Sequence, residues 1–391
     1  MTRTILDLHL LQTVPPSNLN RDDTGTPKTA MYGGARRARV SSQAWKRATR
    51  HAFHDLLDPS ELGVRTKRVA DLVAEAIQRQ DGSVTAADGW ALAASVITAA
   101  TGSKIEAPRG KAEDGVAPES KYLMFLSAAQ VDALAALAIE GRDDITTFVK
   151  DKENKARAKQ IANSRHSVDI ALFGRMVADG AGVNVDAAAQ VAHAISVHRV
   201  DNESDYYTAV DDRKNREAED DLGAGMIGNV DFNSATLYRY AALDVDLLRR
   251  NLGMGLREDE DPATPLRRAV EAFVEGFICS LPTGKINTFG NHTLPDVVIA
   301  KLRTARPVSF VSAFEAPCRP DPETGGYLRG ACDRLAHYIT DIETTYGITD
   351  DDHTWTMRTG DNTEPLVGLG ERMPLRDLIT TVGEQTAARQ G

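Results

Sequence analysis

The amino-acid sequence predicts an α+β protein built on a ferredoxin-like βαββαβ core with large insertions. Two observations support this class. Segments with strand or helix periodicity follow the order strand, helix, inserted helices, strand, strand, helix, strand. In addition, 42% of the 391 residues are hydrophobic, which is enough to build a substantial core.

The first two elements of this core lie near the N-terminus. Residues 4–12 (TILDLHLLQ) alternate in part and contain β-compatible aliphatic residues, so we expect the first strand there. A polar loop follows, and Ser41 or Ser42 can then cap a helix that runs from about Gln43 to Leu57. This helix carries apolar residues at helical spacing, namely Trp45, Ala48, Ala52, Phe53 and Leu56.

A long insertion interrupts the core after this helix. Residues 60–165 are rich in alanine and contain several stretches with helical periodicity. These stretches are RTKRVADLVAEAIQR, GWALAASVITAATG, VDALAALAIEG and TTFVKDKENKARAKQIANS. We therefore expect a helical subdomain there.

The rest of the core follows residue 186. Residues 187–198 (AAAQVAHAISVH) remain open between helix and strand, because alanine favours a helix whereas the alternation of Val191, His193, Ile195 and Val197 favours a strand. A strand (TLYRYAALDV), an amphipathic helix, a β-rich segment (PDVVIAKLRTARPVSFVSAF) and a helix (CDRLAHYITDIETTYG) come next. The apolar stripe of the amphipathic helix consists of Leu266, Val270, Phe273, Val274, Phe277 and Ile278.

The stretch from residue 199 to 233 is polar, highly charged and interrupted by glycines. It is too long for an ordinary connection within a compact domain. A loop of this length is usually functional or disordered.

Composition limits the classes of protein to which this chain can belong. Arg3 is followed by an apolar run that Asp7 and His9 interrupt, which excludes a signal peptide, and no stretch is long enough to span a bilayer. We therefore expect a cytoplasmic protein with no membrane partner. The three cysteines are far apart and lack a CxxC spacing, so neither a disulfide framework nor a zinc site is indicated. We expect no cofactor and no metal.

One segment has a charge opposite to that of the whole chain. The formal net charge is −10, yet residues 24–54 contain seven lysines and arginines and no acid. Such a basic segment on an acidic protein indicates a surface for a polyanion such as a phosphate backbone; the alternative is a solvated face. Its cations are Lys28, Arg36, Arg37, Arg39, Lys46, Arg47 and Arg50.

A second basic cluster lies at the end of the helical insertion, where Asp151 and Glu153 interleave with the cations. A solvated helix face and a second nucleic-acid contact explain it about equally well. Its members are Lys150, Lys152, Lys155, Arg157 and Lys159.

Several longer motifs, taken together, resemble the CasC family, the repeated backbone subunit of the type I-E CRISPR surveillance complex Cascade. They occur in one order along nearly the whole chain and are weakest in the helical insertion and after about residue 300. The motifs are SNLNRDD (17–23), YGGARRARVSSQAWKRATR (32–50), VDIALFGRM (168–176), AHAISVH (192–198), DYYTAVDD (205–212) and YRYAAL (238–243).

The resemblance implies a modified RNA-recognition-type palm, of the RAMP class, with helical fingers and a projecting thumb hairpin. The palm would comprise residues 1–59, 166–198 and 234–391, the last with the C-terminal segment. The fingers would be residues 60–165 and the thumb residues 199–233. Six copies would assemble head to tail along a guide RNA, the crRNA.

The resemblance also assigns roles to individual residues. The segment before and within the first helix would grip the guide backbone, the GRM motif would place a thioether against a base, and the thumb would displace a base at regular intervals. Lys285 is a weaker candidate for a guide-facing loop. The implied RNA-binding residues are Arg21, Lys28, Ser41, Gln43, Lys46, Arg50, Arg175, Met176, Tyr206, Tyr207, Thr208 and Lys285.

In this family the partners are the crRNA, the target DNA strand paired to it, and other copies of the same chain. Further partners are subunits of the CasA, CasB, CasD and CasE families and, indirectly, a recruited helicase-nuclease. The subunit would be non-catalytic. It would hold single-stranded RNA by its backbone, and specificity would be delegated to base pairing between guide and target.

The alternative function is a metal-dependent, RNA-guided ribonuclease, an activity found in backbone subunits of other CRISPR systems. Asp22 and Asp23 are the acids that could hold a metal, although paired acids in a polar loop more often form turns. His193 and His198 are five residues apart, a spacing that does not bring both side chains onto one metal from a strand or from a helix.

Overall fold

The computed structural model describes residues 3–106, 116–177, 183–209, 226–253, 261, 263–323, 325–348 and 353–390. Within these residues, ten strands form one sheet in the order β14-β13-β12-β1-β11-β9-β3-β2, and β8 and β10 each pair with β11 outside this path. The strands are β1 (Ile5–Ser17), β2 (Thr29–Tyr32), β3 (Ala35–Val40), β8 (Ala189–Val191), β9 (Ala194–Ser196), β10 (Glu203–Ala209), β11 (Met226–Asp244), β12 (Val297–Arg303), β13 (His353–Arg358) and β14 (Glu371–Arg372).

The sheet is mixed. Strands β13 and β14 are parallel, whereas β1 pairs antiparallel with both β11 and β12. The α+β class predicted from the sequence is confirmed in this coarse form. Residues 187–198, which the sequence left open between helix and strand, form the short strands β8 and β9, with residues 192 and 193 between them.

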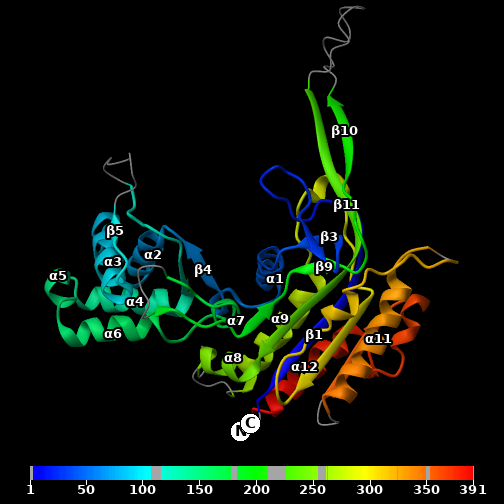
Figure 1. Ribbon diagram of the computed structural model, residues 1–391. Coiled ribbons are helices and arrows are strands. Elements are labelled where there is room, and N and C mark those ends of the chain that lie inside the picture. The colour runs from blue at the N-terminus through cyan, green and yellow to red at the C-terminus, as the bar shows by residue number, and fades with distance from the viewer. Residues whose placement is uncertain are drawn as a thin grey trace, which may run out of the picture.

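Helices cover both faces of the sheet (Figure 1). Because side chains alternate along a strand, Leu6, Leu8 and Leu10 of β1 pack on one face, whereas Leu11 packs on the other. The first face is covered by α1 (Ser42–Leu56), α8 (Val245–Leu252), α9 (Ala263–Cys279) and α12 (Leu375–Ala388), and the second by α11 (Leu328–Thr345). All six residues of the predicted α9 stripe are buried.

A helical lobe with its own hydrophobic core lies beside the sheet (Figure 1). Its helices α3 to α6 begin at polar caps: for example, the Ser127 hydroxyl and the Gln130 side chain form a capping box, and Asp151 caps the last helix. That cap separates two helices where the sequence predicted one continuous helical stretch. The helices are α2 (Val69–Gln80), α3 (Ala86–Thr101), α4 (Ala128–Glu140), α5 (Ile145–Phe148) and α6 (Lys152–Ala162).

Short elements join the lobe to the sheet. Strands β4 (Gly63–Thr66) and β7 (Met124–Ser127) pair antiparallel next to α7 (Val168–Phe173), and β5 (Ile105–Glu106) pairs with β6 (Glu119–Ser120). Further short elements are α10 (Ile286–Phe289) and the 3-10 turns Pro59–Glu61, Val311–Phe314 and Asp361–Leu366.

No helix in the described part of the chain is both long and apolar enough to cross a bilayer.

Strand β10 and the first half of β11 form a two-stranded ribbon that projects beyond the sheet (Figure 1). The chain termini lie near the opposite end of the molecule. Residues 210–225, the middle of the predicted thumb with most of its acids, lie outside the described residues.

Candidate nucleic-acid interface

Helix α1 presents part of the basic segment to solvent. Ser41 caps the helix, because its hydroxyl accepts a hydrogen bond from the Ala44 amide at 3.3 Å. Trp45 and Phe53 are buried against the sheet, so the helical period turns Gln43 and Arg47 outward. The predicted N-cap and amphipathic helix are therefore confirmed.

The outward face of α1 forms one wall of an open groove with a volume of about 890 Å³. The other walls come from the β4–β7 pair, the end of α7 with the following turn, and residues 184–187. Five residues predicted from the sequence line this groove: Gln43, Lys46, Arg50, Arg175 and Met176. The fold thus brings together residues that lie more than a hundred positions apart in the chain.

Arg50 joins α1 to the elements across the groove. Its Nε donates to Asp169 Oδ2 at 2.8 Å, and its Nη2 donates to the Gly63 carbonyl at 3.1 Å. The guanidinium also lies over the Phe125 ring, 4.5 Å from its centre. The Arg50 side chain is 30% exposed.

Arg175 lies beneath the groove surface. Its guanidinium donates to the carbonyls of Val183 at 2.7 Å, Ala162 at 2.6 Å and Phe125 at 3.2 Å. Burial lowers the pKa of Arg175 to about 10. All three guanidinium nitrogens thus have protein acceptors.

The next residue, Met176, is the opposite case, because its side chain is 86% exposed. Gly174 makes the turn before it possible: φ is +78°, and a Cβ there would lie 2.8 Å from the Val185 carbonyl oxygen. A turn anchored by a buried arginine therefore presents a thioether to the groove.

Two further arginines and two histidines line the groove, and the predicted site residues do not include them. Arg47, His51 and His54 follow the outward face of α1, a continuation that the i, i+4 spacing could have indicated. Arg65 comes from β4, where an arginine in a short strand gives no sequence signal for the far wall of a groove. Lys46, a predicted cation that lines the same groove, is partly buried, and burial lowers its pKa.

Arg37 corrects the prediction that the whole basic segment faces one ligand. It is fully buried, and its guanidinium donates to the Ser196 carbonyl at 3.0 Å and to the Phe314 and Glu315 carbonyls at 2.8 and 2.9 Å. The turn before it packs closely, since a Cβ on Gly33 would lie 1.7 Å from the Glu315 carbonyl oxygen. Arg37 thus holds the β2–β3 hairpin on the body of the protein.

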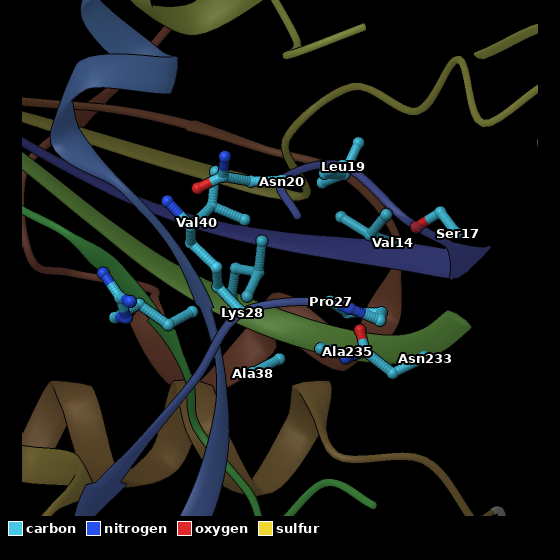
Figure 2. Close-up of a pocket in the computed structure, with 12 residues that line it drawn as sticks. Val14, Ser17, Leu19, Asn20, Pro27, Lys28, Ala38, Val40, Asn233 and Ala235 are labelled. Atoms are coloured by element: carbon cyan, nitrogen blue, oxygen red, sulfur yellow. The ribbon is translucent and has the colours of Figure 1, made fainter. Parts of the chain in front are cut away.

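The loop from residue 18 to 28 lies next to the start of α1. The Asn20 side chain accepts a hydrogen bond from the Ser41 amide at 2.9 Å, and the Asn20 carbonyl accepts one from the Lys28 amide at 2.9 Å. Arg21 is exposed and Lys28 is half-buried. Lys28 lines a cavity of about 20 Å³ between β1, β3 and β11, which has room for about one water and no nucleotide (Figure 2).

Two other predicted groups lie near the base of the ribbon or on it. Lys285 is exposed, and its φ is +51°. The preceding Gly284 packs on the loop of residues 18–28, because a Cβ there would lie 2.4 Å from the Asn18 carbonyl oxygen. On the ribbon, Tyr206 and Thr208 are exposed, and Tyr207 lies opposite Gly228. Neither group lines the groove.

The second basic cluster lies on α6 and the turn before it, on the helical lobe and outside the groove lining. All its members are exposed. Arg157 pairs with Glu140 at 2.9 Å, which raises the pKa of the arginine. The cations Lys150, Lys152, Lys155 and Lys159 have no ion-pair partner among the described residues.

Of the two acids considered for a metal, Asp22 has local partners and Asp23 is exposed. Asp22 Oδ1 accepts bonds from the Thr24 hydroxyl at 2.7 Å and from the Thr24 and Thr26 amides at 3.0 and 3.1 Å, and these bonds lower the pKa of Asp22. His193 lies beside Arg39, with Nδ1 3.2 Å from Nη1, whereas the buried His198 ring stacks on Tyr327. The bonds from Asp22 to the Thr24 and Thr26 amides are the pattern of an Asx turn.

Comparison with known proteins relates this fold to a class of subunits. A chain of a "CRISPR RNA-guided surveillance complex, pre-nicking" is 35% identical, with a TM-score of 0.81, covering 98% of this chain and 100% of that chain. A chain of another "CRISPR RNA-guided surveillance complex" is 30% identical, with a TM-score of 0.69, covering 96% and 99%. The fold is that of chains found in such complexes.

The family is established by a family model described as CT1975-like protein, which matches residues 6–381. The chain belongs to this family, and the recognition based on the sequence motifs is confirmed. Among curated protein sequences, none matches.

Proposed function

We propose that this chain is the guide-RNA-binding backbone subunit of a type I-E CRISPR surveillance complex, and that several copies polymerise along the crRNA. The observation that carries the proposal is the groove along α1, where predicted polar and cationic residues face an exposed methionine. Membership of the CT1975-like family supports it.

The architecture supports a palm, fingers and thumb. The sheet order β12-β1-β11-β9 corresponds to fourth, first, third and second strand of a βαββαβ unit, with α1 and α9 as its two helices. We assign this unit, the ferredoxin-like palm, to residues 1–59, 166–198 and 234–391. The helical lobe, residues 60–165, corresponds to the fingers, and residues 199–233 correspond to the thumb.

The two sides of the groove suit the two parts of a nucleotide. On α1, Gln43 and Lys46 offer an amide and a cation to phosphate and sugar oxygens. Across the groove, Met176 offers an apolar contact to a base, which is tolerant of sequence. A subunit that serves every guide needs this combination, because it cannot depend on any one base.

The buried and half-buried members of the predicted site support the surface from behind. Ser41 caps α1, Arg50 holds α1 to β4, and Arg175 anchors the turn that carries Met176. We propose that Arg175 acts by positioning Met176 and not by direct contact with RNA, because its nitrogens already have acceptors.

The remaining predicted residues extend the track beyond the groove. Arg21, Lys28 and Lys285 belong to two loops that pack together next to the start of α1. We propose that Tyr206, Tyr207 and Thr208 on the ribbon contact a base of the bound guide, and the exposure of their side chains supports this role.

The proposed partners follow the family. They are the crRNA, the target DNA strand paired to it, copies of this chain in a six-subunit backbone, and subunits of the CasA, CasB, CasD and CasE families. The exposed α6 cations support a contact with target DNA. We propose a cytoplasmic, non-catalytic subunit in which cleavage is left to a recruited helicase-nuclease.

The test is co-purification of RNA with the full chain expressed with its complex subunits. Lys46→Ala should reduce the bound RNA and the salt dependence of assembly, because fewer counterions are displaced. Lys104→Ala is the matched control, since Lys104 is exposed and lies outside the groove lining. Equal RNA content in wild type and Lys46→Ala would contradict this role of the groove.

A further inference from the structure

The cations of the groove fall into two groups. Arg50 and Arg175 are engaged by protein acceptors. Lys46, Arg47 and Arg65 have no hydrogen-bond or ion-pair partner among the described residues, although all three line the same groove. Uncompensated cations that share a cleft repel one another, and on a chain with a net charge of −10 this arrangement indicates an anionic ligand.

Arg65 reaches the groove because of the register of β4. Arg65 lies opposite Phe125 of β7, and both side chains line the groove, whereas the neighbouring pair Val64 and Leu126 does not. The alternation of side chains along a strand explains this difference. Arg65 itself is exposed.

A three-residue junction fixes β4 against α1. Asp169 accepts a hydrogen bond from the Gly63 amide at 3.0 Å through Oδ1 and one from Arg50 Nε at 2.8 Å through Oδ2. Arg50 in turn donates to the Gly63 carbonyl at 3.1 Å. Glycine is needed at this position, since a Cβ would lie 2.7 Å from the Phe125 ring and 2.8 Å from the Ser167 hydroxyl.

We propose that Arg65 is a further phosphate-binding residue of the guide track and acts together with Lys46 and Arg47 from the other side of the groove. Its ligand is the phosphodiester backbone of single-stranded RNA. Arg50 and Asp169 are then positioning residues that hold Arg65 in place. This inference rests on the proposed function and adds to it a contact from the helical-lobe side.

Other charged or titratable groups in the groove do not remove the need for an anion. Asp186 is the one carboxylate among its lining residues, whereas His51 and His54 lie near the cations with their rings 6.1 Å apart. One carboxylate does not neutralise the charges of Lys46, Arg47 and Arg65. A phosphodiester backbone can meet cations on both sides of a groove.

The experiment measures binding of the full-length chain to a fluorescently labelled single-stranded RNA of mixed sequence, by anisotropy at several salt concentrations. Arg65→Ala should weaken binding about tenfold. It should also reduce the steepness of the plot of log K against log salt concentration by about 0.7 for each bound copy. Arg65→Lys should keep the slope and recover part of the affinity, because it keeps the charge and loses the planar fork. Lys67→Ala is the matched control, an exposed cation two residues away and outside the groove lining.

The outcomes separate this inference from the proposed function. Equal binding by Arg65→Ala and Lys67→Ala, with weaker binding by Lys46→Ala, would overturn the role of Arg65 and leave the proposed function intact. Absence of RNA binding by the wild-type chain, or binding unaffected by Lys46→Ala, would count against both. A selective loss in Arg65→Ala, with an unchanged melting temperature, would support the inference.

Discussion

Replacement of Asp169 by alanine tests the junction on which the groove depends. The Asp169 side chain is 2% exposed. Its two oxygens accept hydrogen bonds from the Ser167 hydroxyl at 2.6 Å, the Gly63 amide at 3.0 Å and Arg50 Nε at 2.8 Å. The alanine variant leaves the Gly63 amide without its acceptor and the Arg50 cation without its anion.

The expected loss of stability follows from these contacts. Removal of one partner from a buried ion pair costs about 3–5 kcal/mol, because the other charge stays behind. Arg50 is 30% exposed and can be partly solvated, so we expect the lower end, about 3 kcal/mol. Urea unfolding followed by circular dichroism measures this loss.

The same variant also tests whether Asp169 positions Arg65, because loss of the junction frees β4 from α1. RNA affinity should fall, and the added effect of Arg65→Ala should be smaller in the Asp169→Ala background than in wild type. Asp169→Asn is the control, because asparagine keeps the shape of the aspartate side chain and removes its charge. Stability within about 0.5 kcal/mol of wild type, together with fully additive effects on RNA binding, would refute the reasoning.

Met176→Ala should weaken RNA binding by about 1 kcal/mol without changing the melting temperature, because the side chain is exposed; equal anisotropy curves would argue against a base contact. Burial and nearby Arg175 lower the pKa of His166 to about 4, so the unfolded chain binds a proton there between pH 6.5 and 4 and the folded chain does not. The free energy of unfolding should therefore fall by up to about 1.4 kcal/mol per pH unit as the pH drops through this range, and His166→Gln should flatten that slope. The complex should not cut complementary RNA with Mg²⁺ or Mn²⁺; sequence-guided cuts that vanish in Asp22→Ala would favour the ribonuclease.

Local patterns predicted the elements that position the site. Ser41 as a cap and Trp45 and Phe53 as an apolar stripe were enough to predict α1, because capping and amphipathicity act within a few residues. The stripe of α9 was predicted for the same reason. The register of the sheet and the break before α6 depend on contacts or caps that periodicity alone does not show.

The charged residues show where local reasoning ends. Arg37 belongs to a basic segment and yet is buried, because carbonyls from residues 196, 314 and 315 surround it. Arg50 pairs with an aspartate 119 positions away, and Arg65 joins the groove only through its pairing in β4. Met176 could be singled out only from the family motif, since an isolated methionine usually fills a core.

The most direct test of the guide-binding proposal is the composition of the purified particle. The chain is expressed with its neighbouring complex subunits, and the native mass and the ratio of absorbance at 260 and 280 nm are measured on the same sample. The proposal predicts a nucleoprotein in which several copies of this chain share one RNA. An RNA-free monomer, both alone and with those subunits, would contradict it.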